Sequence, residues 1–518
     1  MFARSVRLTA RCSCRPPVTR ALPKHRAYTT GPKLPTSPVS AGDPSAIALK
    51  SLMTELDKLA PRFDVQASQI RIIETPVEFY DTLKTRILNA KKHIFLSTLY
   101  IGKNELELME TLRQALRSNP ELTVSIMADA LRGTREDPNP SCMSLIADLK
   151  RDFPDRVEGR MFHTPNLVGF LKSRIPRRFN EGWGLQHMKL YGIDDELILS
   201  GANLSSDYFT DRQDRYHLIS SGPVTQYYRN VYQAICKLSM TIELDSNTGR
   251  PALQKADIAE HLADRDVYTS KATEILAPLI KPVVSEQKIH ETDTRIYPLF
   301  QFTSVLSPDS STELPAMRLL LKALATKPFV GSSWLFTAGY FNMTPEIRDL
   351  LLQTNPAQGT VLAASPWANG FYGSKGASGM LPAAYTYLAR QFLSSVSKLQ
   401  LSDTIKLKEW RLGTVNTPGG WSYHAKGVWV SLPGESDPSI TLIGSSNYTK
   451  RSYNLDLEGN ALIVTENPDL KRRLGQEQTW LQRYATEMSE NDFVRTDRRV
   501  GLHVRIAMWI VTAVGGAL

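Results

Sequence analysis

The chain has 518 residues, of which 42% are hydrophobic and 22% are charged, and this balance excludes a disordered, collagen-like or polytopic membrane protein. A chain of this length holds about two or three domains. Its formal net charge is +10, but residues 1–42 carry eight basic side chains and no acidic one, which leaves 54 basic against 52 acidic residues in the rest. Because that remainder has a basic excess of only two residues, we expect no nucleic-acid partner.

The first segment, residues 1–30, is rich in Arg, Ser and Thr and lacks Asp and Glu. These features are typical of a mitochondrial transit peptide, and the absence of a long apolar run argues against a secretory signal. A basic tail that binds another molecule is the alternative. Residues 31–45 follow as a linker rich in Pro and Ser.

Residues 46–240 form the first half of a repeated unit. Apolar runs at 91–100 and 122–130 predict strands, and the amphipathic segment between them predicts a helix. Farther along, His187 and Lys189 lie in a strand pattern and share one face, because strand side chains alternate. The next strand pattern ends at Asn203, and Asp214 follows eleven residues later.

Residues 241–290 are charged and predict a helical connector, and residues 291–500 then repeat the first half. Strands are predicted at 332–340 and 359–365, His424 and Lys426 share a strand face, and Glu458 lies eleven residues after Asn447. The tyrosines, histidines and asparagines of the two halves are offset by 240, 237 and 244 residues, which indicates a duplication. Strands that alternate with helices predict an α/β fold.

Each half offers a histidine, a lysine, an asparagine and a carboxylate, and this set suits phosphate-ester chemistry. An imidazole can attack phosphorus and form a phospho-histidine, lysine and asparagine can hold the phosphate oxygens, and a carboxylate can fix the imidazole tautomer. The catalytic candidates are His187, Lys189, Asp194, His424 and Lys426. The phosphate-binding candidates are Asn203 and Asn447, and the histidine-orienting candidates are Asp214 and Glu458.

Three further segments indicate contacts with substrate or membrane. Arginines before the first histidine and a glycine-rich loop could bind a phosphate, or form only a solvated basic face and a flexible loop. The residues concerned are Arg174, Arg177, Arg178 and Lys375. Residues 501–518 form an apolar tail behind a group of arginines, which suits an anchor at the surface of an anionic membrane, or a helix packed on the domain.

The spacing of His187, Lys189 and Asp194 resembles the H-x-K-x4-D motif that occurs twice in each active site of the phospholipase D superfamily. The second copy departs from the motif, because Ser431 occupies the Asp position after His424 and Lys426. Residues 174–216, 369–392, 421–430 and 444–458 resemble the mitochondrial phosphatidylglycerophosphate synthases, whose second motif also lacks the Asp. The resemblance covers roughly residues 45–500.

The resemblance implies two pseudo-symmetric phospholipase D-like halves, each a mixed β-sheet flanked by helices, with the active site at their interface. It implies transfer of the phosphatidyl group of CDP-diacylglycerol to sn-glycerol 3-phosphate, which gives phosphatidylglycerophosphate, a precursor of phosphatidylglycerol and cardiolipin, and CMP. By analogy His187 is the nucleophile that forms a phosphatidyl-histidine, and His424 is the acid and then the base. The near-symmetry leaves the reverse assignment open. No metal or other cofactor is implied, and the enzyme is expected on the surface of the mitochondrial inner membrane.

Three alternatives remain. The site could pass its phosphoryl group to water, as a phosphodiesterase or nuclease does. It could serve another phosphatidyltransferase, such as a cardiolipin or phosphatidylserine synthase. The chain could also be an inactive scaffold that binds anionic lipid, although both histidines and both lysines are present.

Overall fold

The computed structural model describes residues 44–136, 140–175, 180–282 and 292–513, and these described residues form one compact unit. The predicted transit peptide, most of the predicted linker, Arg177 and Arg178 lie outside the described residues.

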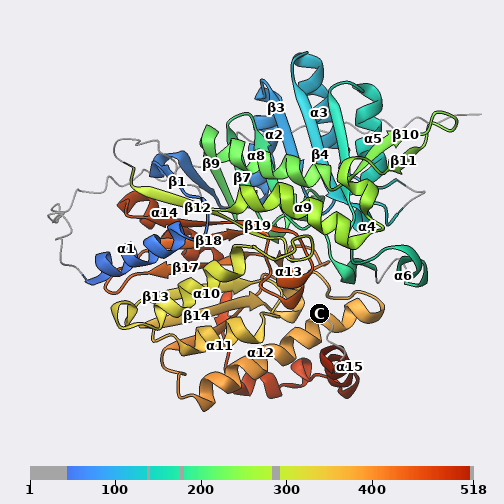
Figure 1. Ribbon diagram of the computed structural model, residues 1–518. Coiled ribbons are helices and arrows are strands. Elements are labelled where there is room, and N and C mark those ends of the chain that lie inside the picture. The colour runs from blue at the N-terminus through green and yellow to red at the C-terminus, as the bar shows by residue number, and fades with distance from the viewer. Residues whose placement is uncertain (1–43, 137–139, 176–179, 283–291, 514–518) are drawn as a thin grey trace, which may run out of the picture. The chain divides into compact units, whose positions relative to one another are not determined.

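Two mixed sheets organise the described residues (Figure 1). The first sheet contains, in spatial order, β11 (Pro251–Gln254), β10 (Met240–Leu244), β5 (Val157–Phe162), β4 (Thr123–Asp129), β3 (His93–Ser97), β6 (Leu190–Ile193), β7 (Glu196–Ser200), β9 (Tyr216–Ser220) and β2 (Ile70–Ile73). The second contains β1 (Phe63–Val65), β12 (Thr294–Gln301), β19 (Glu458–Thr465), β18 (Ile440–Gly444), β17 (Lys426–Ser431), β13 (Ser333–Ala338), β14 (Gln358–Ala364), β15 (Ile405–Trp410) and β20 (Ala485–Glu487).

The two sheets share one topology, which confirms the predicted α/β duplication. The order β5-β4-β3-β6-β7-β9-β2 matches β15-β14-β13-β17-β18-β19-β12 strand for strand. In each sheet three neighbouring strands run parallel and the following strands are antiparallel. The four strand predictions correspond to β3, β4, β13 and β14, because these apolar runs are buried on both faces of a helix-covered sheet.

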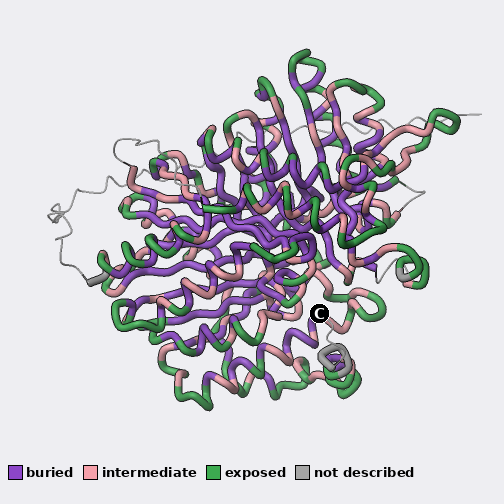
Figure 2. The backbone as a smooth tube through the Cα atoms, viewed as in Figure 1, coloured by how far each residue is buried: buried purple, intermediate pink, exposed green. Residues whose placement is uncertain are grey.

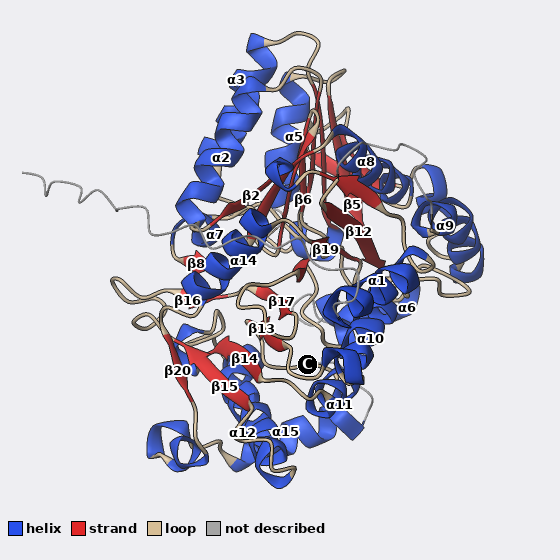
Figure 3. Ribbon diagram, turned by 90° about the vertical axis from the view of Figure 1, so that its left-hand side faces the viewer, coloured by secondary structure: helices blue, strands red, loops and turns tan. Residues whose placement is uncertain are grey.

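Helices cover both sheets. Those that follow or flank the strands of the first sheet are α2 (Pro76–Asn89), α3 (Leu106–Ser118), α4 (Ala130–Gly133), α5 (Cys142–Asp152), α6 (Gly169–Arg174), α7 (Ser206–Thr210), α8 (Gly222–Lys237) and α9 (Arg265–Ile280). Those of the second are α1 (Pro44–Asp57), α10 (Glu313–Leu324), α11 (Pro345–Gln353), α12 (Leu381–Lys398), α13 (Lys450–Asn454), α14 (Pro468–Leu481) and α15 (Leu502–Ala513). Figure 3 shows α2, α3 and α5 on one side of the first sheet and α8 and α9 on the other.

The core has three main parts. One lies under α2, α3 and α5, a second lies between the outer helices and the second sheet, and a third is shared by both halves around α8 and α9. In the shared part, Leu199 of β7 and Tyr228 of α8 belong to the same cluster as Phe300 of β12 and Trp429 of β17. Figure 2 shows the most continuous burial along the strands of both sheets. The halves therefore share one hydrophobic core.

The expected boundaries of the halves need two corrections. Residues 46–65 do not belong to the first half, because α1 packs in the core of the second half and β1 pairs with β12. The connector is not wholly helical, because β10 and β11 extend the first sheet before α9 begins. In both cases an edge strand continues a sheet, and local sequence patterns do not show which sheet a short edge strand joins.

A buried ionic cluster also joins the halves. The guanidinium of Arg215, which precedes β9, donates to both carboxylate oxygens of Glu477 in α14 at 2.9 Å and lies 3.7 Å from the ring centre of Trp429. His217 and Trp429 also hydrogen bond to Glu477. A Cβ at Gly427 would lie 1.9 Å from Nη1 of Arg215, so this position in the second motif must be glycine for the guanidinium to fit.

Candidate active site

The segment that carries His187 is held by the second half. Gln186 forms a parallel bridge with Leu457, the N–H of His187 donates to the carbonyl of Leu457 at 2.9 Å, and the N–H of Leu457 donates to Leu185. His187 lies three residues before β6. The expectation that His187 lies within a strand of its sheet is therefore wrong, because its backbone pairs across the interface.

The segment that carries His424 is held in the corresponding way by the first half. β16 (Ser422–Tyr423) pairs in parallel with β8 (Arg212–Gln213) of the first half, and these two strands lie side by side in Figure 3. The N–H of His424 donates to the carbonyl of Gln213 at 2.8 Å. His424 lies between β16 and β17, and Lys426 is the first residue of β17. Each histidine is thus placed by backbone bonds to the opposite half.

The carboxylates are exchanged between the halves. Nδ1 of His187 lies 3.0 Å from both Oε atoms of Glu458, and Nδ1 of His424 lies 2.6 Å from Oδ2 of Asp214. All four side chains are buried. Each imidazole is therefore oriented by the carboxylate of the other half, and neither half has a complete histidine–carboxylate pair alone.

The lysines occupy the same buried region. Nζ of Lys189 donates to the carbonyl of His187 at 2.6 Å, and Nζ of Lys426 lies 2.8 Å from Nδ1 of His424 and 3.5 Å from Asp214. A Cβ at Gly201, in the first half, would lie 2.6 Å from Nζ of Lys426. The glycine thus lets an ammonium of the second half reach the end of a first-half strand.

Burial and charge set the protonation of these groups. Burial opposes ionisation of Asp214, but Lys426 and the hydrogen bond from His424 lower the pKa of Asp214 below its usual value. Burial, with Lys426 nearby, lowers the pKa of His424 to about 3. Burial raises the pKa of Glu458 to about 7, and burial together with Lys189 lowers the pKa of His187. Both imidazoles are therefore neutral at rest, with a lone pair available for attack or proton transfer.

The two halves share one electrostatic environment. Burial lowers the pKa of Lys189; the charge of Lys426 lowers it further, and the charge of Glu458 acts in the opposite direction. Burial also lowers the pKa of Lys426. Two buried ammonium groups that repel one another create a site that favours an anion, and a phosphate would restore their full charge.

The asparagines differ in their contacts. Nδ2 of Asn203 donates to the hydroxyl of Tyr208 at 3.1 Å, whereas the backbone N–H of Asn447 donates to Ser452. Tyr208 and Tyr340 both pack edge-on against the imidazole of His424, with ring centres 5.2 Å away. Tyr340 is the second-half tyrosine of the predicted repeat, whereas no repeated pattern marks Tyr208, because it differs from the equivalent residue of the second half.

Two buried aspartates that the sequence analysis missed fix the segment before His187. Asp129 accepts a hydrogen bond from the N–H of Gln186, and Asp456 accepts one from the N–H of Leu185, both at 2.9 Å. Burial raises the pKa of Asp129 to about 8. Only their positions in the sequence could have indicated these two residues: Asp129 ends a repeated strand, and Asp456 lies two residues before Glu458.

Asp194 contacts none of the other catalytic candidates. Its carboxylate accepts hydrogen bonds from the N–H groups of Lys91, Lys92 and His93, at 2.7 to 3.0 Å, and so ties the turn before β7 to the start of β3. At the equivalent position of the second half, Ser431 bonds weakly to the carbonyl of Ser436 at 3.5 Å. These contacts are those of a residue that holds a turn.

The basic residues predicted to bind a phosphate outside the histidine–lysine site lie on exposed segments. Arg174 ends α6 with its guanidinium 4.4 Å from the ring centre of Phe170, and Lys375 lies in an exposed loop before α12. Arg177 and Arg178 lie outside the described residues. No contact among the described residues links Arg174 or Lys375 to either imidazole, so their role stays a prediction.

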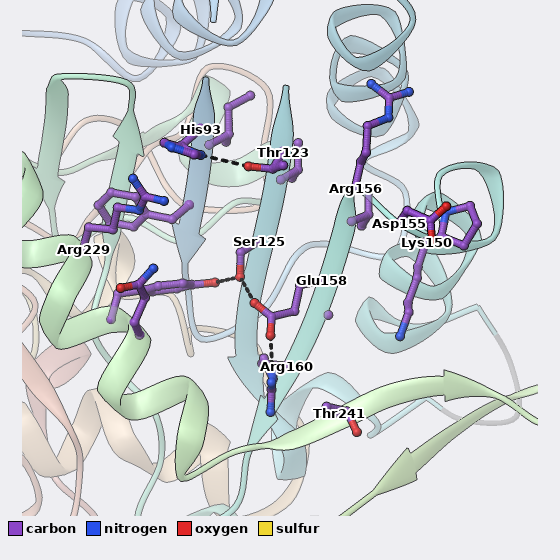
Figure 4. Close-up of a pocket in the computed structure, with 18 of the residues that line it drawn as sticks. His93, Thr123, Ser125, Lys150, Asp155, Arg156, Glu158, Arg160, Arg229 and Thr241 are labelled. Carbon is purple, nitrogen blue, oxygen red and sulfur yellow. Dashed lines mark hydrogen bonds and ion pairs between the residues drawn. The ribbon is translucent and has the colours of Figure 1, made fainter. Parts of the chain in front are cut away.

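Two hollows flank the first sheet at opposite ends of its parallel strands. One, of about 270 Å³, is lined by Tyr100, Arg132 and residues 205–207, which directly precede Tyr208. The other, of about 440 Å³, lies where β3, β4 and β5 begin (Figure 4). In this second hollow Glu158 bonds to Ser125 and Arg160, so these polar groups satisfy one another.

Within residues 44–136, 140–175, 180–282 and 292–513, no group of three or more His, Cys, Asp or Glu side chains is arranged to hold a metal ion.

Comparison with known proteins gives consistent relatives, although no family model matches the chain. The chain is 43% identical to the CDP-diacylglycerol–glycerol-3-phosphate 3-phosphatidyltransferase of Saccharomyces cerevisiae over 493 residues, which cover 91% of this chain and 94% of the relative. It is 36% identical to the mitochondrial enzyme of the same name from Homo sapiens, with 86% of this chain and 83% of the relative covered. The crystal structure of phosphatidylserine synthase from Haemophilus influenzae superposes with a TM-score of 0.69 at 20% identity, over 90% of this chain and 98% of that one. That structure establishes the shared fold.

Proposed function

The chain belongs to the CDP-diacylglycerol–glycerol-3-phosphate 3-phosphatidyltransferase family, and on that premise we propose that it works through a phosphatidyl-histidine intermediate. The enzyme transfers the phosphatidyl group of CDP-diacylglycerol to sn-glycerol 3-phosphate and releases CMP. The observation that carries the proposed intermediate is the exchange of carboxylates, which gives two oriented imidazoles in one buried site.

His187 is the proposed nucleophile. With its Nδ1–H directed at Glu458, the lone pair on Nε2 can attack the phosphatidyl phosphorus, while the bond from that phosphorus to the CMP oxygen breaks. No hydrogen bond from a described residue reaches Nε2 of His187, whereas Nε2 of His424 already contacts the hydroxyl of Tyr208. This difference supports His187 as the attacking group and His424 as the base.

The remaining candidates stabilise charge. Lys189, Lys426, Asn203 and Asn447 are proposed to hold the non-bridging oxygens of the phosphoryl group. Preformed donors of this kind in a water-poor site contribute strongly to catalysis, since they need no reorganisation when charge develops. The chemistry assigned to these residues uses no metal ion.

The direct test is an acceptor assay. The purified full chain is incubated with CDP-diacylglycerol and, separately, sn-glycerol 3-phosphate, serine, phosphatidylglycerol or water, and both CMP and lipid products are followed. We expect rapid phosphatidylglycerophosphate formation with sn-glycerol 3-phosphate alone. Phosphatidic acid as the main product in every tube would indicate a phosphodiesterase, and a product with serine or phosphatidylglycerol would indicate another phosphatidyltransferase.

The acceptor carries its own phosphate, for which we propose Arg174, Arg177, Arg178 and Lys375 as candidate ligands. Loss of a cation that binds this phosphate should raise KM for sn-glycerol 3-phosphate and leave the first turnover of CMP unchanged, since CMP is released before the acceptor reacts. Arg174→Ala and Lys375→Ala are measured by steady-state kinetics, with the exposed Lys398→Ala as the control. An unchanged KM in both variants would exclude these two residues.

We also propose that the enzyme, which is mitochondrial like its named relatives, lies on the inner membrane surface through α15. Val504 and Met508 of this helix pack against α12, while Leu502, Ile506 and Trp509 are 68%, 49% and 72% exposed. The exposed residues share one side of the helix at i, i+4 and i+7. Both alternatives for the tail thus receive support, since one face packs on the domain and the other is free for lipid.

The basic residues near α15 are only partly available. Arg498 donates to both oxygens of the buried Glu409, whereas Arg499 and Arg505 are exposed. None of the helices among the described residues has both the length and the apolar character to cross a bilayer. An apolar helix face beside exposed arginines supports binding at the surface of an anionic membrane.

The combined change of Leu502, Ile506 and Trp509 to Ser should weaken binding to anionic vesicles at least about tenfold, because each buried apolar side chain contributes about 1.5–3 kcal/mol. Cosedimentation with phosphatidylglycerol and phosphatidylcholine vesicles measures this effect. Leu399→Ser removes a similarly exposed side chain elsewhere and serves as the control. Unchanged sedimentation of the triple variant would refute the α15 anchor.

A further inference from the structure

Tyr208 occupies the reactive side of His424. Its hydroxyl lies 3.4 Å from Nε2 of the imidazole and accepts a hydrogen bond from Nδ2 of Asn203 at 3.1 Å. The side chain is only 2% exposed, and the guanidinium of Arg212 lies 4.6 Å from its ring centre. The hydroxyl is therefore held at the nitrogen that must exchange a proton with substrate.

Among the residues that the structure describes, the second half has no such group at His187. Tyr208 lies five residues after Asn203, and the residue five after Asn447 is Ser452, whose hydroxyl accepts from the N–H of Asn447. The segments after Asn203 and Asn447 are otherwise alike, because each contains an ion pair between residues at equivalent positions. The pairs are Asp207 with Arg212 in the first half and Arg451 with Asp456 in the second. The tyrosine is thus a difference between the two halves at a place where their architecture is the same.

Hydrogen-bond chemistry fixes the direction of the contact. Two groups compete for Nδ1 of His424: Asp214 at 2.6 Å can only accept, and the Lys426 ammonium at 2.8 Å can only donate. The shorter contact assigns the proton to Nδ1, and Lys426 then donates to Asp214 at 3.5 Å. Nε2 then carries a lone pair and accepts from the O–H of Tyr208. Because the tyrosine oxygen has two lone pairs and Asn203 uses one, it can accept one further hydrogen bond. Burial raises the pKa of Tyr208 well above 10, which keeps the hydroxyl protonated.

The segment that carries Tyr208 also borders a hollow. Residues 205–207, directly before Tyr208, line the hollow of about 270 Å³ that also contains Arg132 and Tyr100, so a polar molecule held there would lie beside the helix that carries the tyrosine.

We propose that Tyr208 is a catalytic residue that relays the proton of the acceptor hydroxyl to His424, an inference that rests on the proposed covalent mechanism. The acceptor O–H bond breaks and its proton passes to the tyrosine oxygen, while the tyrosine O–H proton passes to Nε2 of His424. The acceptor oxygen bonds to phosphorus, the bond from phosphorus to Nε2 of His187 breaks, and its electron pair returns to that nitrogen. His424 then releases its proton to solvent.

The relay matters mainly in the second half-reaction. CMP leaves as a phosphate monoester, whose second pKa is about 6, so its departure needs little help from an acid. An alcohol is a far weaker acid, so its attack depends on a base. Loss of the relay should therefore leave formation of the intermediate intact and slow its transfer to the acceptor.

The test compares Tyr208→Phe with Tyr340→Phe by rapid quench, with the full chain and labelled CDP-diacylglycerol. Tyr340 packs against the same imidazole, but no hydrogen bond joins these two described side chains. In Tyr208→Phe we expect a CMP burst of wild-type rate and amplitude, followed by transfer slowed about 10²-fold, as loss of a proton-transfer group does. Tyr340→Phe should keep the wild-type ratio of the two rates.

The opposite result is also defined. Equal slowing of both half-reactions in Tyr208→Phe, or wild-type transfer, would overturn the relay. Should this variant fold poorly, a proton inventory of the transfer step in the wild-type enzyme replaces it: a curved dependence on deuterium fraction supports two protons in motion, and a straight one overturns the relay. Failure of the covalent mechanism itself is distinct, since it would abolish the CMP burst and the labelled protein in the wild-type enzyme.

Discussion

His187→Asn should release no CMP and form no labelled protein, with activity reduced about 10⁴-fold or more, as expected when a covalent nucleophile is removed. His424→Asn should behave differently. It should still release one CMP per enzyme and accumulate a phosphatidylated protein, because departure of CMP needs little acid while attack by the acceptor needs a base.

The reason lies in the different surroundings of two otherwise equivalent imidazoles. Both are buried, neutral and oriented by a carboxylate of the opposite half. Within the described part of the chain, only His424 contacts a tyrosine hydroxyl at Nε2. A nitrogen whose lone pair already accepts a hydrogen bond is a poorer nucleophile, but it is positioned to take up the proton of that hydrogen bond as a base.

The measurement is acid-labile label on the protein after one turnover with phosphate-labelled CDP-diacylglycerol, beside quenched CMP. Circular dichroism and the melting temperature show whether each variant is folded. If label accumulates on His187→Asn and is absent from His424→Asn, the nucleophile is His424 and the roles are reversed.

Much of the fold could be predicted because its signals are local. The apolar runs of β3, β4, β13 and β14 repeat at a nearly constant offset, and a buried parallel strand needs such a run. The two histidine–lysine pairs and the two carboxylates could be located for a similar reason, because the His-x-Lys spacing and the eleven-residue spacing from asparagine to carboxylate recur in both halves.

The pairing of those groups could not be predicted, because it depends on how the halves dock. In sequence, Asp214 follows His187 and Glu458 follows His424, so each half suggests a pair of its own. The structure instead joins Asp214 to His424 and Glu458 to His187, since short parallel bridges at the interface place each carboxylate beside the opposite imidazole. Such contacts leave no local pattern.

The same limit applies to the edges of the halves and to the ionic cluster. β1 joins the second sheet although it precedes the first half in sequence, and Arg215 finds Glu477 across the shared core. A basic residue directly after Asp214 looks like any other charged residue in the sequence. Arg215 is completely buried only because Gly427, which is distant in sequence, leaves space for the guanidinium.

Glu477→Gln should lower the free energy of unfolding by about 3–5 kcal/mol, because it leaves the buried charge of Arg215 without its partner. Burial opposes ionisation of this carboxylate, but Arg215 and His217 hold the pKa of Glu477 far below its usual value. A depressed carboxylate pKa stabilises the fold at pH values above the unfolded pKa of about 4.3. The contribution is therefore complete at neutral pH and is lost as the pH falls below that range.

Urea unfolding at pH 7 measures the effect, with Glu346→Gln as the matched control, since its partner Arg318 is 40% exposed and such a pair contributes less than about 1 kcal/mol. Because Arg215 directly follows Asp214, Glu477→Gln should also reduce transfer more than the first turnover of CMP, by displacing the carboxylate that orients His424. Replacing Arg215 and Glu477 together with Met should cost less than the Gln change alone, because no unpaired charge remains. A double variant less stable than Glu477→Gln would mean that packing around the cluster, rather than its charge balance, holds the two halves together.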